Sequence, residues 1–152
     1  MATRNGSGKW TGDIRSGSGR LTVGHDAWSA GYSWTSRFKG VDPSLPDDET
    51  KTATNPEEVL AAAHAACFSM ALTLGLTEAG HAPSSIETKA RVHLRVVNEV
   101  PTIQEIELET EGDVPGLDQE AFREHAEQTK TSCIISRALA GVEQINLSAS
   151  LA

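Results

Sequence analysis

The two cysteines are the residues of this chain whose type and position most directly suggest chemistry. Cys67 lies near the middle of an almost uncharged segment, VLAAAHAACFSMALTLGL (59–76), and Cys133 follows 66 positions later in TSCIISRAL. A thiol inside an apolar helix is a poor nucleophile, because desolvation raises its pKa. A reactive role for Cys67 therefore requires a cation supplied by another part of the sequence.

Cys133 lies in a different local setting. Thr131 or Ser132 can cap the helix that begins there, and a helix N-terminus stabilises a thiolate through its partial positive charge and free N–H groups. Each cysteine also has a purely structural interpretation, since free cysteine is commonly a small buried hydrophobe. Taken alone, the two positions leave both interpretations open.

Three further residues could contribute to a site around Cys67. His64 precedes it by three positions on the same helix face, which raises a cysteine–histidine hydrolase as an alternative, although a histidine on an apolar helix is more often structural. Glu57 has capping-box spacing from Thr54 and most simply caps its own helix. Ten residues, about 15 Å of helix, separate Glu57 from Cys67, so it could join that thiol only from a second subunit. Arg37 is either a solvated surface cation or the charge that Cys67 needs.

Composition and spacing argue against several classes of protein. The chain has 13 Lys and Arg against 21 Asp and Glu, and its net charge of −8 would repel a nucleic-acid backbone. Its histidines and cysteines lack H-x-x-x-H and C-x-x-C spacing, so we expect no metal and no cofactor. The apolar run 59–76 contains His64, Ser69 and Thr73 and lacks a basic flank, which favours a helix buried in protein over a membrane span.

The cysteine count and the N-terminal segment also indicate a compartment. Two distant cysteines do not make a disulfide scaffold, and MATRNGSGKW lacks the apolar region of a secretory signal. We therefore expect a reducing, cytoplasmic setting.

The elements that must position these residues are expected to form a single α+β domain over 1–152. Short β-type pieces separated by glycines predict an N-terminal hairpin or meander over 9–35, after a flexible tail at 1–8. Prolines and acidic residues without periodicity predict an exposed loop at 41–53.

A long buried helix and a strand-rich C-terminal half follow this loop. The helix begins at Thr54-Asn55-Pro56-Glu57, where proline suits the first turn, and ends at Gly80 and Pro83. Alternation of apolar and polar residues then predicts an antiparallel hairpin of two long strands, each with one buried face. The predicted elements are strands at 85–97 and 102–111 joined through 98–101, a helix at 118–130, a short helix from Cys133 to about Ala140, and a last strand at QINLSASL (144–151).

Four segments carry a resemblance to known proteins. They are WTGDI (10–14), RFKG (37–40), TNPEEVLAAAHAACFSMAL (54–72) and SCIISRALAG (132–141). In order and spacing they resemble the OsmC family of osmotically inducible hydroperoxide reductases, over nearly the whole chain. Organic hydroperoxide resistance proteins are related and share the cysteines, but an arginine in an RF-type motif upstream of the long helix is more similar to the OsmC branch.

The resemblance implies a fold, an activity and a site. The fold would be OsmC-like, with antiparallel sheets wrapped around long central helices in an intertwined homodimer and two sites at the subunit interface. Cys67 would be the peroxidatic cysteine and Cys133 the resolving cysteine, with Arg37 and Glu57 as the polar pair beside the thiolate. Organic hydroperoxides, and hydrogen peroxide less efficiently, would be reduced through an intramolecular disulfide. A dithiol reductant, either a lipoyl protein or a small thiol, would then reset the pair.

Two features depart from the family pattern. Ile134 follows Cys133 where the family usually has proline, which bears on how the short helix begins. The loop at 41–53 is also longer than usual and could reshape the mouth of a pocket. A second hypothesis, from the binding class, is an OsmC-like protein that no longer reduces peroxide and holds a small ligand in its apolar pocket.

Overall fold

The structure is a computed structural model that describes residues 1–46 and 53–152. These residues fall into two compact units, Met1–Val59 and Leu60–Ala152. The loop expected at 41–53 lies partly outside the described residues, since 47–52 are not among them. The assignment of 1–152 to one OsmC-like domain stays a prediction.

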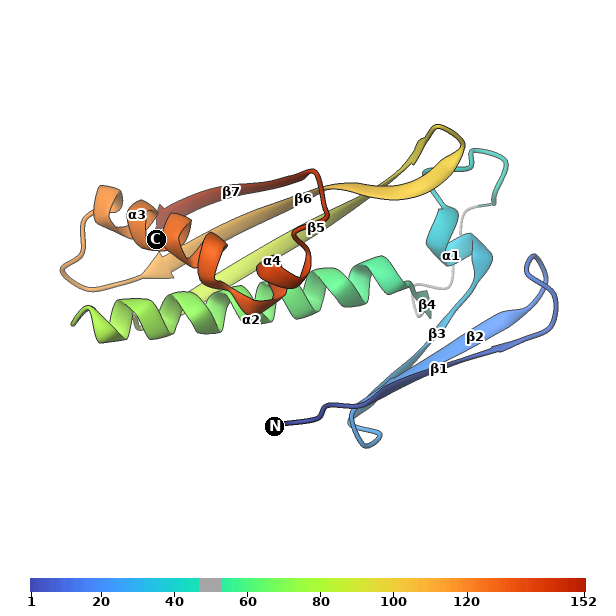
Figure 1. The fold of residues 1–152 in the computed structure, drawn as a ribbon, viewed down its shortest axis with the longest axis horizontal. Coiled ribbons are helices and arrows are strands. Elements are labelled where there is room, and N and C mark those ends of the chain that lie inside the picture. Colours follow the sequence, from blue (N-terminus) through green and yellow to red (C-terminus); the bar gives the residue numbers. More distant parts are fainter. Residues whose placement is uncertain (47–52) are drawn as a thin grey trace. The chain divides into compact units, whose positions relative to one another are not determined.

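The N-terminal unit contains a small four-stranded sheet (Figure 1). Its strands are β1 (Gly6–Thr11), β2 (Ser18–Val23), β3 (Trp28–Tyr32) and β4 (Ala53–Thr54). The first three form the predicted antiparallel meander, and β4 pairs in parallel with β3. The expected tail at 1–8 is shorter than predicted, because Gly6, Ser7 and Gly8 already pair with β2. Backbone groups alone make a ladder, so a Gly-Ser-Gly segment can join a strand.

A short helix, α1 (Trp34–Phe38), follows β3 where the sequence predicts more strand. Ser33 and Ser36 form a reciprocal capping box. The Ser33 hydroxyl accepts from the Ser36 N–H at 3.0 Å, and the Ser33 N–H donates to the Ser36 hydroxyl at 2.9 Å. Arg37 therefore projects from a helical turn.

Helix α2 (Pro56–Glu78) is the long apolar helix predicted from the sequence. Pro56 occupies its first position, as expected. The capping residue, however, is Asn55, whose side-chain oxygen accepts from the Glu58 N–H at 2.8 Å. The predicted capping role of Glu57 is therefore wrong, because the cap lies one residue later and leaves that carboxylate for another partner.

The C-terminal unit contains a three-stranded sheet and the remaining helices (Figure 1). Its elements besides α2 are β5 (Ser85–Val97), β6 (Val100–Asp113), α3 (Gln119–Ser132), α4 (Ile134–Ala138) and β7 (Gln144–Leu151). All five were predicted in type and order, close to these bounds. β5 and β6 form the predicted antiparallel hairpin, turning at Asn98 and Glu99, which both have positive φ. β7 pairs in parallel with β6, an exception to the antiparallel pattern expected.

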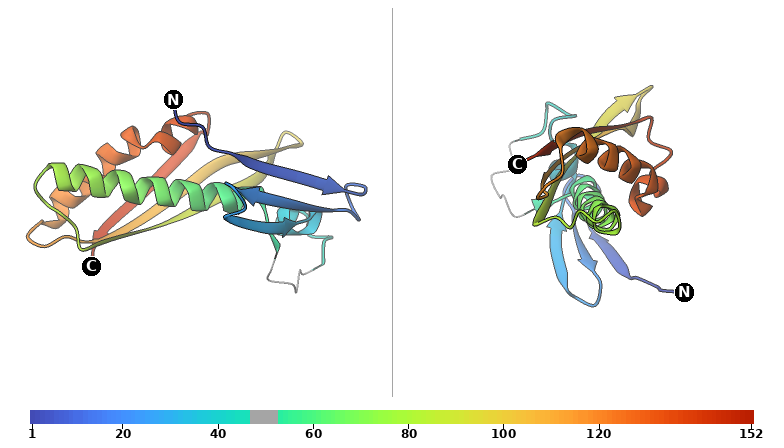
Figure 2. Two further views of the ribbon diagram at one scale, coloured as in Figure 1. Left: turned by 90° about the horizontal axis from the view of Figure 1, so that it is seen from below. Right: turned by 90° about the vertical axis from the view of Figure 1, so that its left-hand side faces the viewer.

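The core of this unit lies where α2 and α3 cover one face of the sheet (Figure 2). Phe68, Leu72 and Leu76 follow one another at intervals of four residues on α2, so they form one stripe, and they pack with Leu108 of β6 and Phe122 of α3. Among the described helices, α2 alone has the length and composition to cross a membrane. Its buried stripe identifies it as a core helix.

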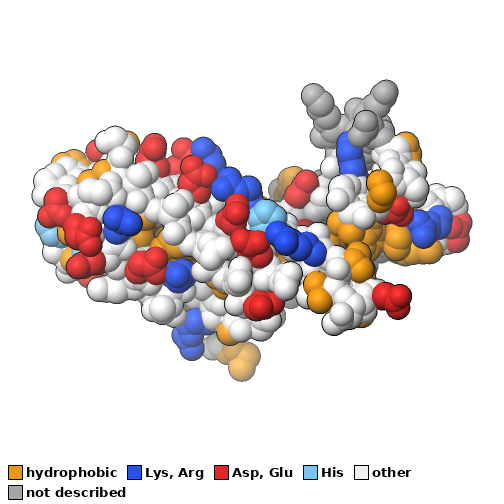
Figure 3. Space-filling view, turned by 90° about the horizontal axis from the view of Figure 1, so that it is seen from above, with side chains coloured by type: hydrophobic (Ala, Val, Ile, Leu, Met, Phe, Trp, Pro, Cys, Tyr) orange, Lys and Arg blue, Asp and Glu red, His pale blue; other side chains and the backbone are white. Residues whose placement is uncertain are grey.

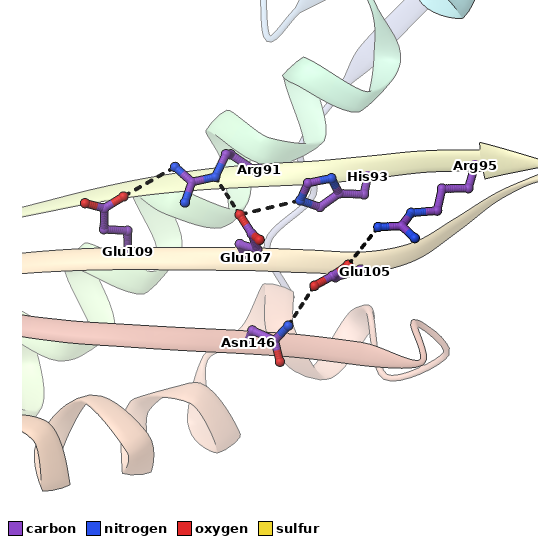
Figure 4. A network of polar contacts seen from close by, with 7 residues as sticks. All are labelled: Arg91, His93, Arg95, Glu105, Glu107, Glu109 and Asn146. Atoms are coloured by element: carbon purple, nitrogen blue, oxygen red, sulfur yellow. Dashed lines mark hydrogen bonds and ion pairs between the residues drawn. The ribbon is translucent and has the colours of Figure 1, made fainter. Parts of the chain in front are cut away.

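The other face of the sheet is charged. Arg91 donates to Glu107 at 2.6 Å and to Glu109 at 3.3 Å, and Arg95 donates to Glu105 at 3.3 Å (Figure 4). Figure 3 shows acidic and basic side chains interspersed over the surface. Exposed pairs of this kind are screened by water and salt and add little stability. This face is therefore a solvated surface, and the two cysteines lie on the helical side of the sheet.

Candidate active site

The two cysteines lie next to each other in the C-terminal unit. Their sulfur atoms are 3.4 Å apart, and both thiols are free. Cys67 comes from the middle of α2, and Cys133 is the residue between α3 and α4. A disulfide holds its sulfurs about 2.05 Å apart. The pair is therefore reduced and needs only a small movement to form a bond.

The break between α3 and α4 presents Cys133. Its backbone leaves the helical region, with φ −54° and ψ 128°. Its N–H donates to the Thr129 carbonyl at 2.8 Å and ends α3, while its carbonyl accepts from the Arg137 N–H at 3.0 Å and begins α4. Ile134 takes the first position of α4, which suits proline because no intrahelical N–H bond is made there. Isoleucine in this place does not prevent the helix from starting.

The surroundings give the two thiols different acidities. Burial raises the pKa of Cys67, the backbone N–H of Ile135 offsets part of that effect, and Cys133 raises the pKa further. Burial also raises the pKa of Cys133, but the backbone N–H and hydroxyl of Ser136, the Cys67 thiol and the backbone N–H of Ile135 together leave this pKa below its ordinary value. Cys67 thus becomes the stronger nucleophile only if a cation is brought to it.

A buried polar pair lies behind Cys133. His64 of α2 is fully buried, and its Nε2 lies 2.8 Å from the hydroxyl of Ser136 on α4. Burial lowers the pKa of His64, so the ring is neutral at physiological pH. Its Nδ1 has no hydrogen-bond partner in the described part of the chain. His64 is therefore bonded to Ser136 and not to Cys67, and the alternative cysteine–histidine hydrolase pair is not formed.

Arg37 and Glu57 form an ion pair in the N-terminal unit. Nε and Nη2 of Arg37 both donate to Oε1 of Glu57, at 3.1 and 2.9 Å. The side chain of Glu57 is only 10% exposed, whereas that of Arg37 is 43% exposed. Oε2 of Glu57 is buried and accepts no hydrogen bond from the residues described. Both hydrogen bonds of the ion pair thus converge on the same carboxylate oxygen.

Two hydrogen bonds hold α1 against the start of α2 and so align this ion pair. The Ser36 hydroxyl donates to the Thr54 carbonyl at 2.8 Å, and the Asn55 side-chain amide donates to the Ser36 carbonyl at 3.1 Å. Arg37 directly follows Ser36, and Glu57 directly follows Pro56 at the start of α2, so these bonds bring the two charged residues together. Ser36 was not predicted as a site residue, because its only local signal in the sequence is its spacing from Ser33.

The structure thus groups the four predicted site residues as two pairs, one in each unit. Arg37 is bonded to Glu57, and Cys67 lies against Cys133. The hydrogen bond between His64 and Ser136 was not predicted. The only signal of Ser136 in the sequence is that it lies three residues after Cys133. The described residues contain no group of three or more His, Cys, Asp or Glu side chains that could hold a metal ion.

Comparison with known proteins gives one consistent family. Residues 47–148 match the family model described as OsmC-like protein. The chain is 39% identical over 137 residues to Peroxiredoxin OsmC of Escherichia coli K12, a match that covers 90% of this chain and 89% of that protein. The protein of the same name from Shigella flexneri gives the same values.

Solved structures share the fold at lower identity. An organic hydroperoxide resistance protein from Elizabethkingia anophelis has a TM-score of 0.76 at 22% identity, over 100% of this chain and 98% of that chain. The organic hydroperoxide resistance protein OhrB of Bacillus subtilis has a TM-score of 0.70 at 22% identity, over 97% and 98%. These similarities support the predicted α+β, OsmC-like fold.

Proposed function

The chain belongs to the OsmC-like protein family, and we propose that this peroxidase reduces organic hydroperoxides to alcohols, and hydrogen peroxide less efficiently, with a pair of cysteines. The curated relatives named peroxiredoxin, at 39% identity, support the peroxidase class. The 3.4 Å between the sulfur atoms of Cys67 and Cys133 is the observation that carries the mechanism. A peroxidase that resolves its own sulfenic acid needs a second thiol beside the first.

Cys67 is the peroxidatic residue in the proposed cycle. Its thiolate attacks one oxygen of the hydroperoxide, the O–O bond breaks, and the leaving oxygen takes a proton to become an alcohol. Cys67 is left as a sulfenic acid. This side chain is partly exposed while Cys133 is buried, so an incoming peroxide meets Cys67 first. The apolar residues packed around Cys67 favour an alkyl hydroperoxide over hydrogen peroxide.

Arg37 supplies the positive charge that the Cys67 thiolate lacks. A guanidinium beside a buried thiol offsets desolvation and lowers the pKa of that thiol. Glu57 fixes one edge of the guanidinium through two hydrogen bonds. Because α2 is continuous from Pro56 to Glu78 and rises about 1.5 Å per residue, the Arg37–Glu57 pair that serves Cys67 comes from a second subunit.

The same ion pair orients the peroxide. Arg37, the more exposed partner of the pair, donates hydrogen bonds to the oxygens of the hydroperoxide. Donors on Arg37 then stabilise the negative charge that develops on the leaving oxygen.

A homodimer accounts for apolar residues that one chain leaves uncovered on α2. Met70 is 74% exposed and Leu74 is 59% exposed, and they lie four residues apart on one face of the helix. An exposed apolar stripe beside a buried one indicates an interface, and a second copy of α2 is a matching surface.

The cycle closes through Cys133 and an external reductant. Its sulfur attacks the sulfenic sulfur of Cys67, which forms the disulfide and releases water. A dithiol, from a lipoyl group or a small thiol, then reduces the disulfide by exchange. We place this cycle in the cytoplasm, where such reductants keep thiols reduced.

Turnover of cumene hydroperoxide with excess dithiol tests the proposal. We expect the wild-type protein to consume the peroxide and the Cys67→Ser variant to lose that activity. Wild-type protein that does not turn over, with its thiols still reduced after peroxide treatment, would instead support a family member that binds a small ligand.

A further inference from the structure

We propose that His64 and Ser136 form a buried hydrogen-bond chain that directs a donor at the sulfur of Cys133 and so controls how fast this residue resolves oxidised Cys67. The inference rests on the proposed peroxidase cycle and adds two positioning residues to it. Neither residue touches the peroxide.

The chain of contacts runs from α2 to the break between α3 and α4. His64 Nε2 lies 2.8 Å from the Ser136 hydroxyl. Ser136 lies one helical turn after Cys133, on the first turn of α4. Cys133 is the N-cap of α4 and Ser136 is its third residue, the position whose backbone N–H faces an N-cap side chain. The reduced thiol makes no capping hydrogen bond, and the N–H and hydroxyl of Ser136 lower the pKa of Cys133. Ser136 is thus the link between the histidine and the cysteine.

The direction of these hydrogen bonds follows from the unpaired nitrogen of His64. Nδ1 is buried and has no partner in the residues described. A buried N–H without an acceptor costs more than a buried lone pair without a donor. The hydrogen of the neutral ring therefore sits on Nε2, which donates to the Ser136 oxygen. The hydroxyl hydrogen of Ser136 is then left for the sulfur of Cys133.

Burial excludes a second interpretation of the same residues. A serine–histidine pair could act as a hydrolase, but Ser136 is 5% exposed and His64 is fully buried, so no substrate reaches the hydroxyl. A histidine in an apolar core with one unpaired nitrogen also costs stability relative to an apolar side chain. An effect on the neighbouring thiol explains why a polar pair occupies this place.

The affected step is the formation of the disulfide. The Cys133 thiolate attacks the sulfur of Cys67–SOH, the new S–S bond forms, and the S–O bond breaks. The leaving hydroxide takes up the proton that Cys133 released and becomes water, while His64 keeps its proton throughout. A larger thiolate fraction on Cys133 speeds this attack. Slow attack leaves the sulfenic acid open to a second peroxide and to over-oxidation.

Titration of Cys133 in a Cys67→Ser background tests the chain without needing any turnover. Cys67, the titratable side chain in contact with Cys133, is removed in this background, and His64 is linked to Cys133 through Ser136. We expect Ser136→Ala and His64→Leu to raise the pKa of Cys133 and to slow its alkylation at neutral pH by roughly three- to tenfold. Ser136→Thr and His64→Gln, which keep a hydroxyl and a donor, should stay near the parent.

Ser69→Ala is the matched control, since it removes a serine hydroxyl on α2 that is bonded to Thr88 at 2.8 Å. It should leave the titration unchanged. An unchanged titration in both Ser136→Ala and His64→Leu would overturn the inference, even if the wild-type protein is an active peroxidase. If the Cys133 titration shifts in these variants but the wild-type protein has no peroxidase activity, the proposed function would be overturned. The effect of His64 and Ser136 on Cys133 would still stand.

A second measurement uses the protein with both cysteines. After excess hydroperoxide without reductant, Ser136→Ala should show more of the species heavier by about 32 Da, the sulfinic acid of Cys67, than wild type or Ser136→Thr. Equal amounts in all three proteins would contradict a role of Ser136 in resolution.

Discussion

Glu57 binds Arg37 through only one of its two carboxylate oxygens. Nε and Nη2 of Arg37 both donate to Oε1, whereas Oε2 is buried and has no partner in the part of the chain that the structure describes. The two hydrogen bonds fix the edge of the guanidinium that carries Nε and Nη2, so the other edge of this half-exposed side chain points away from the carboxylate. In the proposed cycle that edge binds the hydroperoxide.

Replacing the carboxylate by an amide of the same size tests this role. Glu57→Gln removes the charge that holds Arg37, and charge-assisted hydrogen bonds contribute roughly 1.5–3 kcal/mol. We expect kcat/KM for cumene hydroperoxide to fall by about ten- to a hundredfold. Glu58→Gln is the matched control, because that neighbouring carboxylate bonds to Thr54 instead. Equal losses in both variants would contradict a specific role of Glu57.

Arg37→Ala should raise the pKa of Cys67 and slow the reaction with peroxide, because the thiol then keeps the full cost of its burial. The titration is read in a Cys133→Ser background, where one thiol remains. Arg20→Ala, a change to an arginine of β2 bonded to Ser29, serves as the control. A Cys67 titration that does not move in Arg37→Ala would remove Arg37 from the site.

Mixed dimers test whether the site is shared between subunits. A subunit with Glu57→Ala lacks the ion pair, and a subunit with Cys67→Ser lacks the thiol. If each site combines Arg37 and Glu57 of one subunit with Cys67 of the other, the mixture should recover one of the two sites. Peroxidase assays of the two variants before and after subunit exchange measure this. No rescue would count against the shared site.

His64 should make the protein less stable in acid. Burial lowers its pKa in the folded state, while in the unfolded chain the ring takes up a proton near pH 6.5. Below that pH the unfolded state binds more protons, so the free energy of unfolding falls as the pH falls, by up to about 1.4 kcal/mol per unit. Urea unfolding should show a weaker acid dependence in His64→Gln, and no such change in His25→Gln, at an exposed position. Parallel curves for all three proteins would refute the prediction.

The C-terminal half of the fold was predictable because its periodicities are strong. Period-two alternation marks β5 and β6, and the apolar stripe of α2 repeats every four residues. The short helix α1 was missed, since five residues are too few for a helical period to show. The parallel pairing of β7 with β6 depends on chain topology, which alternation within one strand does not encode.

The site was predictable in its residue types but not in its contacts. Resemblance to a family identified Arg37, Glu57 and both cysteines, and the structure brings Arg37 to Glu57 and Cys67 to Cys133. Ser36 and Ser136 were missed, because a single serine becomes a site residue only through tertiary packing. The start of α2 was misplaced by one residue, since Thr54 and Asn55 are both suitable caps and only the structure distinguishes them.

The intact mass of the protein after one equivalent of organic hydroperoxide, without reductant, tests the central claim most directly. The wild-type protein should lose about 2 Da as Cys67 and Cys133 join. The Cys133→Ser variant should gain about 16 Da as the sulfenic acid of Cys67, and Cys67→Ser should keep its mass. A gain of oxygen on Cys133 in the Cys67→Ser variant, or wild-type thiols that stay free, would contradict the account.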